Sequence, residues 1–180
     1  MPIARAIQYL VLSAALAMLA GAAMADVSDP VKGAAPAFVV RAFDGAVPAP
    51  SVLWLTPAIK AQARRILGHN PGGLRLRYWR KGDKTAWILK EIGKEEPITA
   101  GFVVAQGHLR ETLVLDYRES RGWEIRYPYF LDQFANAKLD ESLKLNRHID
   151  GISGATLSVR AMQHMARLAL YLDSEVQKSP

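Results

Sequence analysis

The residues best suited to chemistry lie near the C-terminal end, where positions 150–162 read DGISGATLSVRAM. Ser153, Gly154 and Ala155 come directly before Thr156, and an apolar pattern of helical period follows. A helix start offers unpaired backbone N–H groups and a favourable dipole end, and small residues leave that end open to an anion. The pattern is compatible with a phosphate site, with Thr156 at or just before the helix start. On the chemistry of these residues alone, a plain capped turn is the more common interpretation, since the same residue types are frequent at helix starts.

The helix after this motif is predicted from a single apolar stripe. The stripe consists of Leu157, Ala161, Met165, Leu168 and Leu172, and the opposite face carries Arg160, Gln163, His164 and Arg167. A hydrolase triad of Ser153, His148 and Asp150 is a poor interpretation, because residues so close in sequence seldom reach triad geometry and no G-x-S-x-G is present. The four histidines have no metal-ligand spacing, so no metal site is expected.

The motif resembles the D-x-x-S-G-A-T-x-S/T signature of the FMN-binding domain family, found in subunits of the sodium-pumping NADH:quinone oxidoreductase and of Rnf-type complexes. Every defined position from Asp150 to Ser158 matches. In that family the signature threonine carries FMN through a phosphoester bond, which a periplasmic flavin transferase makes from FAD. The resemblance implies covalent FMN on Thr156, with the neighbouring cofactor-binding residues Asp150, Ser153, Gly154, Ala155 and Leu157.

A second segment, RESRGWEIR, resembles the E-[ST]-x-G element of the same family, whose loop lies against the flavin. It adds Glu119, Ser120, Gly122 and Trp123 to the implied site, with Arg121 where many members have proline. The resemblance extends more loosely from about Trp87 to Leu172. Aromatic side chains at 123, 127 and 129 are candidates for stacking on a flavin ring, and core packing is the alternative for each. Arg121 and Arg126 are candidates for contact with the N1–C2 edge of the flavin ring. The alternative is that they are exposed loop residues without such a role.

The first 25 residues have the pattern of a cleavable signal peptide: a basic start at Arg5, an apolar run, and Ala-Met-Ala before Asp26. An uncleaved membrane anchor is the alternative, which the Ala- and Gly-rich run and the cleavage motif disfavour. Cleavage removes one of the 23 Lys and Arg residues, Arg5, so the mature chain keeps a mild excess of basic residues over its 17 Asp and Glu. The absence of cysteine excludes disulfides, c-type haem attachment and a lipidated cysteine. We expect a periplasmic protein and no nucleic-acid partner.

The remaining chain predicts one compact α+β domain. Residues 26–51 contain four prolines and are expected to form an extended lead-in to a single FMN-binding domain over 52–180. Thr56, Pro57 and Gly68 frame a helix. Alternating residues flank turns at 81–84 and at 106–107, which predicts two β-hairpins. A short strand and then a short helix near 130–134 are expected before the motif. Consecutive hairpins followed by helices indicate a mostly antiparallel sheet, with the C-terminal helix starting at the attachment motif.

These features favour an exported flavoprotein that relays electrons between membrane or periplasmic redox proteins. No convincing acid–base set of catalytic residues appears, so an electron-transfer module is expected rather than a stand-alone enzyme. The alternative is a non-redox periplasmic binding module whose SGAT turn is only a helix cap and whose basic surface docks an acidic partner.

Overall fold

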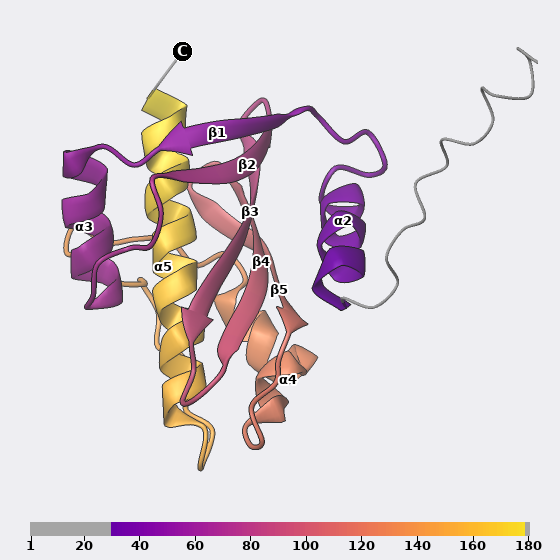
Figure 1. Cartoon of the computed structure of the whole chain (residues 1–180), viewed down its shortest axis with the longest axis vertical. Helices are drawn as coiled ribbons and strands as arrows, with labels where there is room; N and C mark the ends of the chain where they lie inside the picture. The colour runs from indigo at the N-terminus through magenta and orange to yellow at the C-terminus, as the bar shows by residue number, and fades with distance from the viewer. Residues whose placement is uncertain (1–29, 179–180) are drawn as a thin grey trace, which may run out of the picture.

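The computed structural model describes residues 30–178, and its centre is a five-stranded antiparallel sheet (Figure 1). The strands follow one another in the order β1-β2-β3-β4-β5 and span Pro50–Trp54, Arg75–Lys81, Lys84–Ile92, Pro97–Ala105 and His108–Asp116. Both predicted hairpins are confirmed. The turn between β4 and β5 uses Gln106 (φ 56°) and Gly107 (φ 70°), the positive φ angles that a tight hairpin requires.

Two helices cover one face of the sheet. α3 (Pro57–Leu67) begins where Thr56 Oγ1 accepts a hydrogen bond from the Ile59 N–H (3.3 Å), and ends at Gly68 in the left-handed conformation, as predicted. α5 (Thr156–Lys178) runs along the sheet with α3 beside it (Figure 1). Their buried faces enclose the main core, which includes Trp87, Phe102 and Met162. The predicted α+β class, with a C-terminal helix that starts at the motif, is confirmed.

The extended lead-in expected for residues 26–51 is wrong over most of its described part. Residues Pro30–Ala42 form α2, which covers the opposite face of the sheet over β3, β4 and β5 (Figure 1). Phe38, Val39, Ala42 and Phe43 recur at helical spacing and are buried against the sheet. Burial of this apolar face outweighs the backbone hydrogen bond lost at Pro36 inside the helix. The proposed signal peptide lies outside the described residues.

The segment between the sheet and α5 is built of short helical turns. The short strand expected there is instead a 3₁₀ turn, Trp123–Arg126. The short helix expected near 130–134 is present as α4 (Pro128–Leu131), which continues into a second 3₁₀ turn, Asp132–Phe134. Phe130 and Phe134 anchor these turns, because both rings are buried in the main core and pack edge to face.

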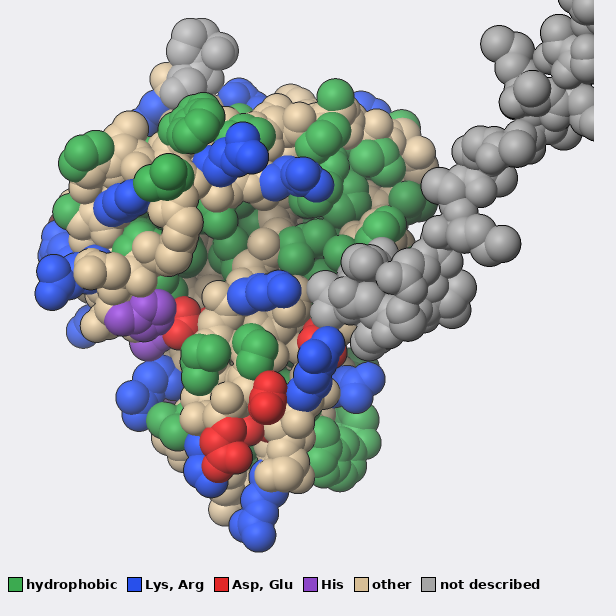
Figure 2. All heavy atoms as spheres, in the orientation of Figure 1, with side chains coloured by type: hydrophobic (Ala, Val, Ile, Leu, Met, Phe, Trp, Pro, Cys, Tyr) green, Lys and Arg blue, Asp and Glu red, His purple; other side chains and the backbone are tan. Residues whose placement is uncertain are grey.

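α2 leaves part of the outer sheet face uncovered. Figure 2 shows hydrophobic side chains together with Lys and Arg on the upper part of one face, the region of β1, β2 and α2 in Figure 1. Val52 and Trp54 of β1 are among the exposed hydrophobic residues, and the Arg75 guanidinium lies over the Trp54 ring. Within residues 30–178, no helix combines the length and the apolar character of a membrane span.

A buried carboxyl group near the end of α5 makes stability depend on pH. Asp173 is 2 % exposed and accepts hydrogen bonds from Thr85 Oγ1 (2.7 Å) and Gln177 Nε2 (3.2 Å). Burial raises the pKa of Asp173, and these donors and Arg80 offset only part of that rise. The charged form is therefore the costly one, so the native chain loses stability as pH rises through the raised pKa, whereas Asp173→Asn does not. We expect the unfolding free energy of the variant, relative to that of the native chain, to increase as the pH rises from the ordinary aspartate pKa through the raised pKa of Asp173. Urea unfolding across that range measures it, and a pH-independent difference would contradict the assignment.

Candidate functional site

No side chain among residues 30–178 caps the N-terminus of α5. Ala155 precedes the helix, its N–H donates to the Ile152 carbonyl (3.0 Å), and its own carbonyl accepts from the Val159 N–H (3.0 Å). Alanine has no side-chain acceptor for the free N–H groups of the first turn. Within the described chain, the Ser153 and Thr156 hydroxyls make no hydrogen bond that would supply one. The turn therefore lacks the interaction that defines a cap, which counts against the helix-cap interpretation.

Gly154 places an open space in front of this helix start. It has φ +79°, a conformation that favours glycine, and a Cβ built on it would meet nothing within 4 Å. Thr156, the first residue of α5, is exposed beside it. Gly154 and Thr156 are therefore accessible to a ligand, as the small residues of the motif predicted.

The second motif segment packs directly against the first. Gly122 has φ +84°, and a Cβ there would lie 2.5 Å from the Ala155 Cβ and 2.8 Å from Tyr117 Oη. The Tyr117 hydroxyl donates to the Arg121 carbonyl and lies 3.1 Å from Ser158 Oγ. Because its one proton goes to the carbonyl, Ser158 is the donor of the second bond. Burial raises the pKa of Tyr117, so the phenol stays protonated for this role. These contacts fasten the 117–122 loop to the first turn of α5.

A cavity of about 520 Å³ lies between these segments, within the roughly 300–1,000 Å³ typical of cofactor sites. Its lining comes from the β3–β4 turn, the loop after β5 and the start of α5: Lys94, Glu119, Ser120, Arg121, Gly154, Ala155, Thr156, Leu157 and Ser158. Two cations and a helix N-terminus at one cavity suit an anionic group such as a phosphate ester. The cavity volume, the uncapped helix start and the charges therefore fit a phosphorylated cofactor.

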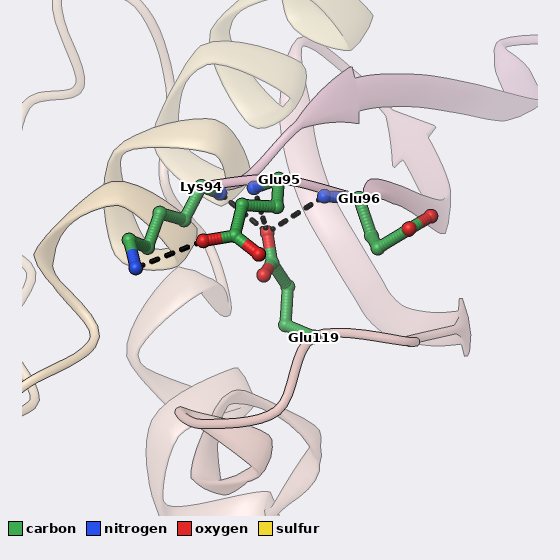
Figure 3. A network of polar contacts seen from close by, with 4 residues as sticks. All are labelled: Lys94, Glu95, Glu96 and Glu119. Carbon is green, nitrogen blue, oxygen red and sulfur yellow. Dashed lines mark hydrogen bonds and ion pairs between the residues drawn. The ribbon is translucent and has the colours of Figure 1, made fainter.

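Glu119 has a different kind of contact from that expected of a cofactor ligand. One carboxylate oxygen accepts hydrogen bonds from three successive backbone N–H groups in the β3–β4 turn, those of Lys94, Glu95 (2.8 Å) and Glu96 (3.1 Å) (Figure 3). Partial burial would raise the pKa of Glu119, but these three donors more than offset it and lower the pKa below its ordinary value. Glu119 therefore holds the turn that carries Lys94 to the cavity wall.

We expect Glu119→Gln to loosen that turn, because a neutral amide oxygen accepts these hydrogen bonds more weakly than a carboxylate. At neutral pH, amide exchange at Lys94, Glu95 and Glu96 should accelerate about three- to tenfold. In the native chain, exchange of these three amides relative to their intrinsic rates at each pH should accelerate in the same way as pH falls through the lowered pKa of Glu119, where the carboxylate is protonated. The control is Glu95→Gln, which removes only the surface ion pair with Lys94 (3.0 Å). Equal exchange in both variants would refute this role.

The other implied site residues divide into two groups. Ser120 and Leu157 line the cavity, and Leu157 is 40 % exposed, so its predicted place in the apolar stripe of α5 is wrong. Ser153, Asp150 and Trp123 are exposed and are not among the lining residues. The Asp150 carboxylate lies 3.6 Å from His148 Nε2, and Trp123 packs edge to face on Tyr127. Their proposed contacts with a cofactor remain predictions.

Two residues of the site were not identified from the sequence. Lys94 lies in a turn more than 50 positions before Thr156, and no motif marks it. Tyr117 precedes the second motif by two residues, and its link to Ser158 depends on the tertiary fold. The one sequence signal for Tyr117 was its position next to the E-[ST]-x-G element. A loop that packs on the motif needs a nearby side chain to anchor it.

Comparison with known proteins agrees with the motif. Residues 93–171 match the family model described as FMN-binding domain, a range that begins at the β3–β4 turn and ends within α5. The crystal structure of NqrC from Shewanella oneidensis is similar in fold, with a TM-score of 0.58 and 14 % identity over 79 % of this chain and 96 % of that chain. No curated protein sequence gives a significant match. The recognition of the FMN-binding domain family is confirmed, and the match supports FMN as the cofactor.

Proposed function

We propose, from the place of residues 93–171 in the FMN-binding domain family, that the chain carries FMN covalently on Thr156 and relays electrons between protein partners. One observation supports this most strongly: residues 119–121 of one motif segment and 154–158 of the other, more than 30 positions apart in the sequence, line the same cavity, with the exposed Thr156 at an uncapped helix start. A turn that served only as a cap would need neither the second segment nor the open space at Gly154.

Several of the lining residues have a specific role in this proposal. The first-turn N–H groups of α5 bind the phosphate, and the helix dipole and the Lys94 and Arg121 side chains balance its charge. Gly154 and Ala155 let the ligand lie against the backbone, and Leu157 offers an apolar contact. When bound, FMN supplies reversible one- and two-electron chemistry. The chain binds and orients it.

Attachment joins Thr156 Oγ1 to the phosphorus of the FMN moiety of FAD. The diphosphate bond breaks, AMP leaves, and the hydroxyl proton is lost. A flavin transferase is the proposed catalyst, because Glu119, the one carboxylate among the lining residues, is already hydrogen-bonded to the backbone of the β3–β4 turn. Donor and acceptor are proposed to be membrane or periplasmic redox proteins. A permanent ester suits an exported protein, because a dissociated cofactor would be diluted outside the cytoplasm.

Export through a cleaved signal peptide is part of the proposal. We expect the mature chain to begin at Asp26, because the Ala-Met-Ala site ends the apolar run. N-terminal sequencing of chain recovered from the periplasm checks this. Chain that retained Met1 or Arg5 would indicate an uncleaved anchor instead.

Colour after denaturation tests the function directly. The chain is expressed with a flavin transferase, unfolded in guanidinium, and passed through gel filtration. We expect flavin absorbance to remain with the polypeptide and, in refolded protein, to bleach with dithionite and return with air. Colourless protein from a host that loads a known acceptor would favour the non-redox binding module.

A further inference from the structure

A second cavity, of about 260 Å³, lies between residues 144–149 and the polar face of α5. It shares no lining residue with the cavity at Thr156. Four of its lining residues are basic, Lys144, Arg147, His148 and Arg167, and none is acidic. The volume falls below the range of roughly 300–1,000 Å³ for drug-sized ligands, which favours a smaller one.

Backbone carbonyl groups hold both guanidinium groups in place. Arg147 Nη1 donates to the carbonyls of Gln133 (3.1 Å) and Ala135 (2.6 Å), and Arg167 Nε donates to the carbonyl of Leu143 (2.6 Å). Each guanidinium has five N–H donors, so both retain donors beyond these bonds. Neither forms an ion pair with a carboxylate within residues 30–178. Fixed guanidinium groups lose little further side-chain entropy when a ligand binds.

The nearest acids leave positive charge uncompensated. Asp140 already accepts hydrogen bonds from the N–H and Oγ of Ser142 and from the Lys144 N–H. Asp150 lies 3.6 Å from His148 Nε2, with both side chains largely in solvent. Burial lowers the pKa of Arg167, and Asp140 offsets this only in part. Burial and the Arg167 charge also lower the pKa of the neighbouring His164. A bound anion would relieve this excess of positive charge.

We propose that this cavity binds a small oxyanion carrying at least two negative charges. Arg147 and Arg167 form its fixed donor pair, and Lys144 adds a further positive charge at the cavity. Inorganic phosphate and a short dicarboxylate share this chemistry. The site is independent of the flavin, so its test can fail without affecting the proposed function.

The test is an NMR titration of the flavin-loaded mature chain with inorganic phosphate and, separately, with succinate, at constant ionic strength in NaCl. We expect saturable shifts of the amides of 144–149 and of Arg167 Nε, with the tighter of the two anions identifying the ligand. Arg167→Gln should weaken binding about tenfold or more, the effect of losing a charge-assisted contact. Lys144→Glu, an exposed change on the cavity rim, should weaken it as well and provides a second variant if Arg167→Gln fails to fold.

Arg64→Gln is the charge-matched control, since Arg64 is exposed on α3 and does not line the cavity. It should leave the affinity for either anion unchanged. Shifts that do not saturate, shifts confined to residues 154–158, or equal affinity in native and Lys144→Glu chains would overturn the site.

Discussion

Replacing Thr156 with valine is expected to abolish covalent FMN while leaving the fold intact. Valine keeps the branched shape of threonine but has no hydroxyl to form the ester. Thr156 is exposed and makes no side-chain hydrogen bond in the described structure, so the free energy of unfolding should change by no more than about 0.5 kcal/mol. Intact-mass spectrometry and a melting curve of chain expressed with the flavin transferase measure both quantities.

Ser120→Ala is the control within the same cavity. Ser120 also lines the cavity and is exposed, but its hydroxyl is not at the helix start. It should retain covalent FMN. Flavin still attached in Thr156→Val, or lost equally in both variants, would contradict the assignment of Thr156.

The second large effect is expected at Gly122. An alanine there must adopt φ +84° with its Cβ 2.5 Å from the Ala155 Cβ, so the two motif segments must separate. Strain and overpacking together should lower the free energy of unfolding by at least about 2 kcal/mol. Flavin loading should fall as well, because the cavity is formed where these segments meet. Urea unfolding and the flavin-to-protein ratio are measured on the same preparation.

Gly154→Val is the informative contrast to Gly122→Ala. Its φ of +79° is unfavourable for valine, at a cost of about 1 kcal/mol or somewhat more, but no atom lies within 4 Å of the added Cβ. The chain should stay folded at 25 °C, yet loading should drop severely because the side chain enters the cavity. Normal loading in folded Gly154→Val would mean that this open space is not part of the cofactor site.

The elements predicted correctly are those whose signals are local. The hairpin at Gln106-Gly107 depends on two residues with positive φ, and α3 depends on Thr56 at one end and Gly68 at the other. α2 was missed because the four prolines of residues 26–51, two of them within α2, and the neighbouring small residues indicate a loop, whereas the helix is stabilised by packing on the far side of the sheet. Leu157 fits the apolar period of α5, but it lies at the helix start beyond the sheet and faces the cavity.

The candidate site shows the same division between local and long-range information. The residues around Thr156 carry the motif in one continuous stretch, so the sequence alone locates them. The wall opposite Thr156 depends on Glu119 reaching the backbone of residues 94–96 and on Tyr117 reaching Ser158. Neither contact follows from spacing or composition. Glu119 was assigned to the site by resemblance, and its hydrogen bonds now indicate that it positions the β3–β4 turn.

The most direct test of covalent attachment is tandem mass spectrometry of proteolytic peptides from native chain expressed with the flavin transferase. The proposal predicts an added mass of about 438 Da, FMN less water, on the peptide that contains residues 150–160, with fragment ions placing it on Thr156. An unmodified peptide from a host that loads a known acceptor, or flavin on any other residue, would contradict the central claim.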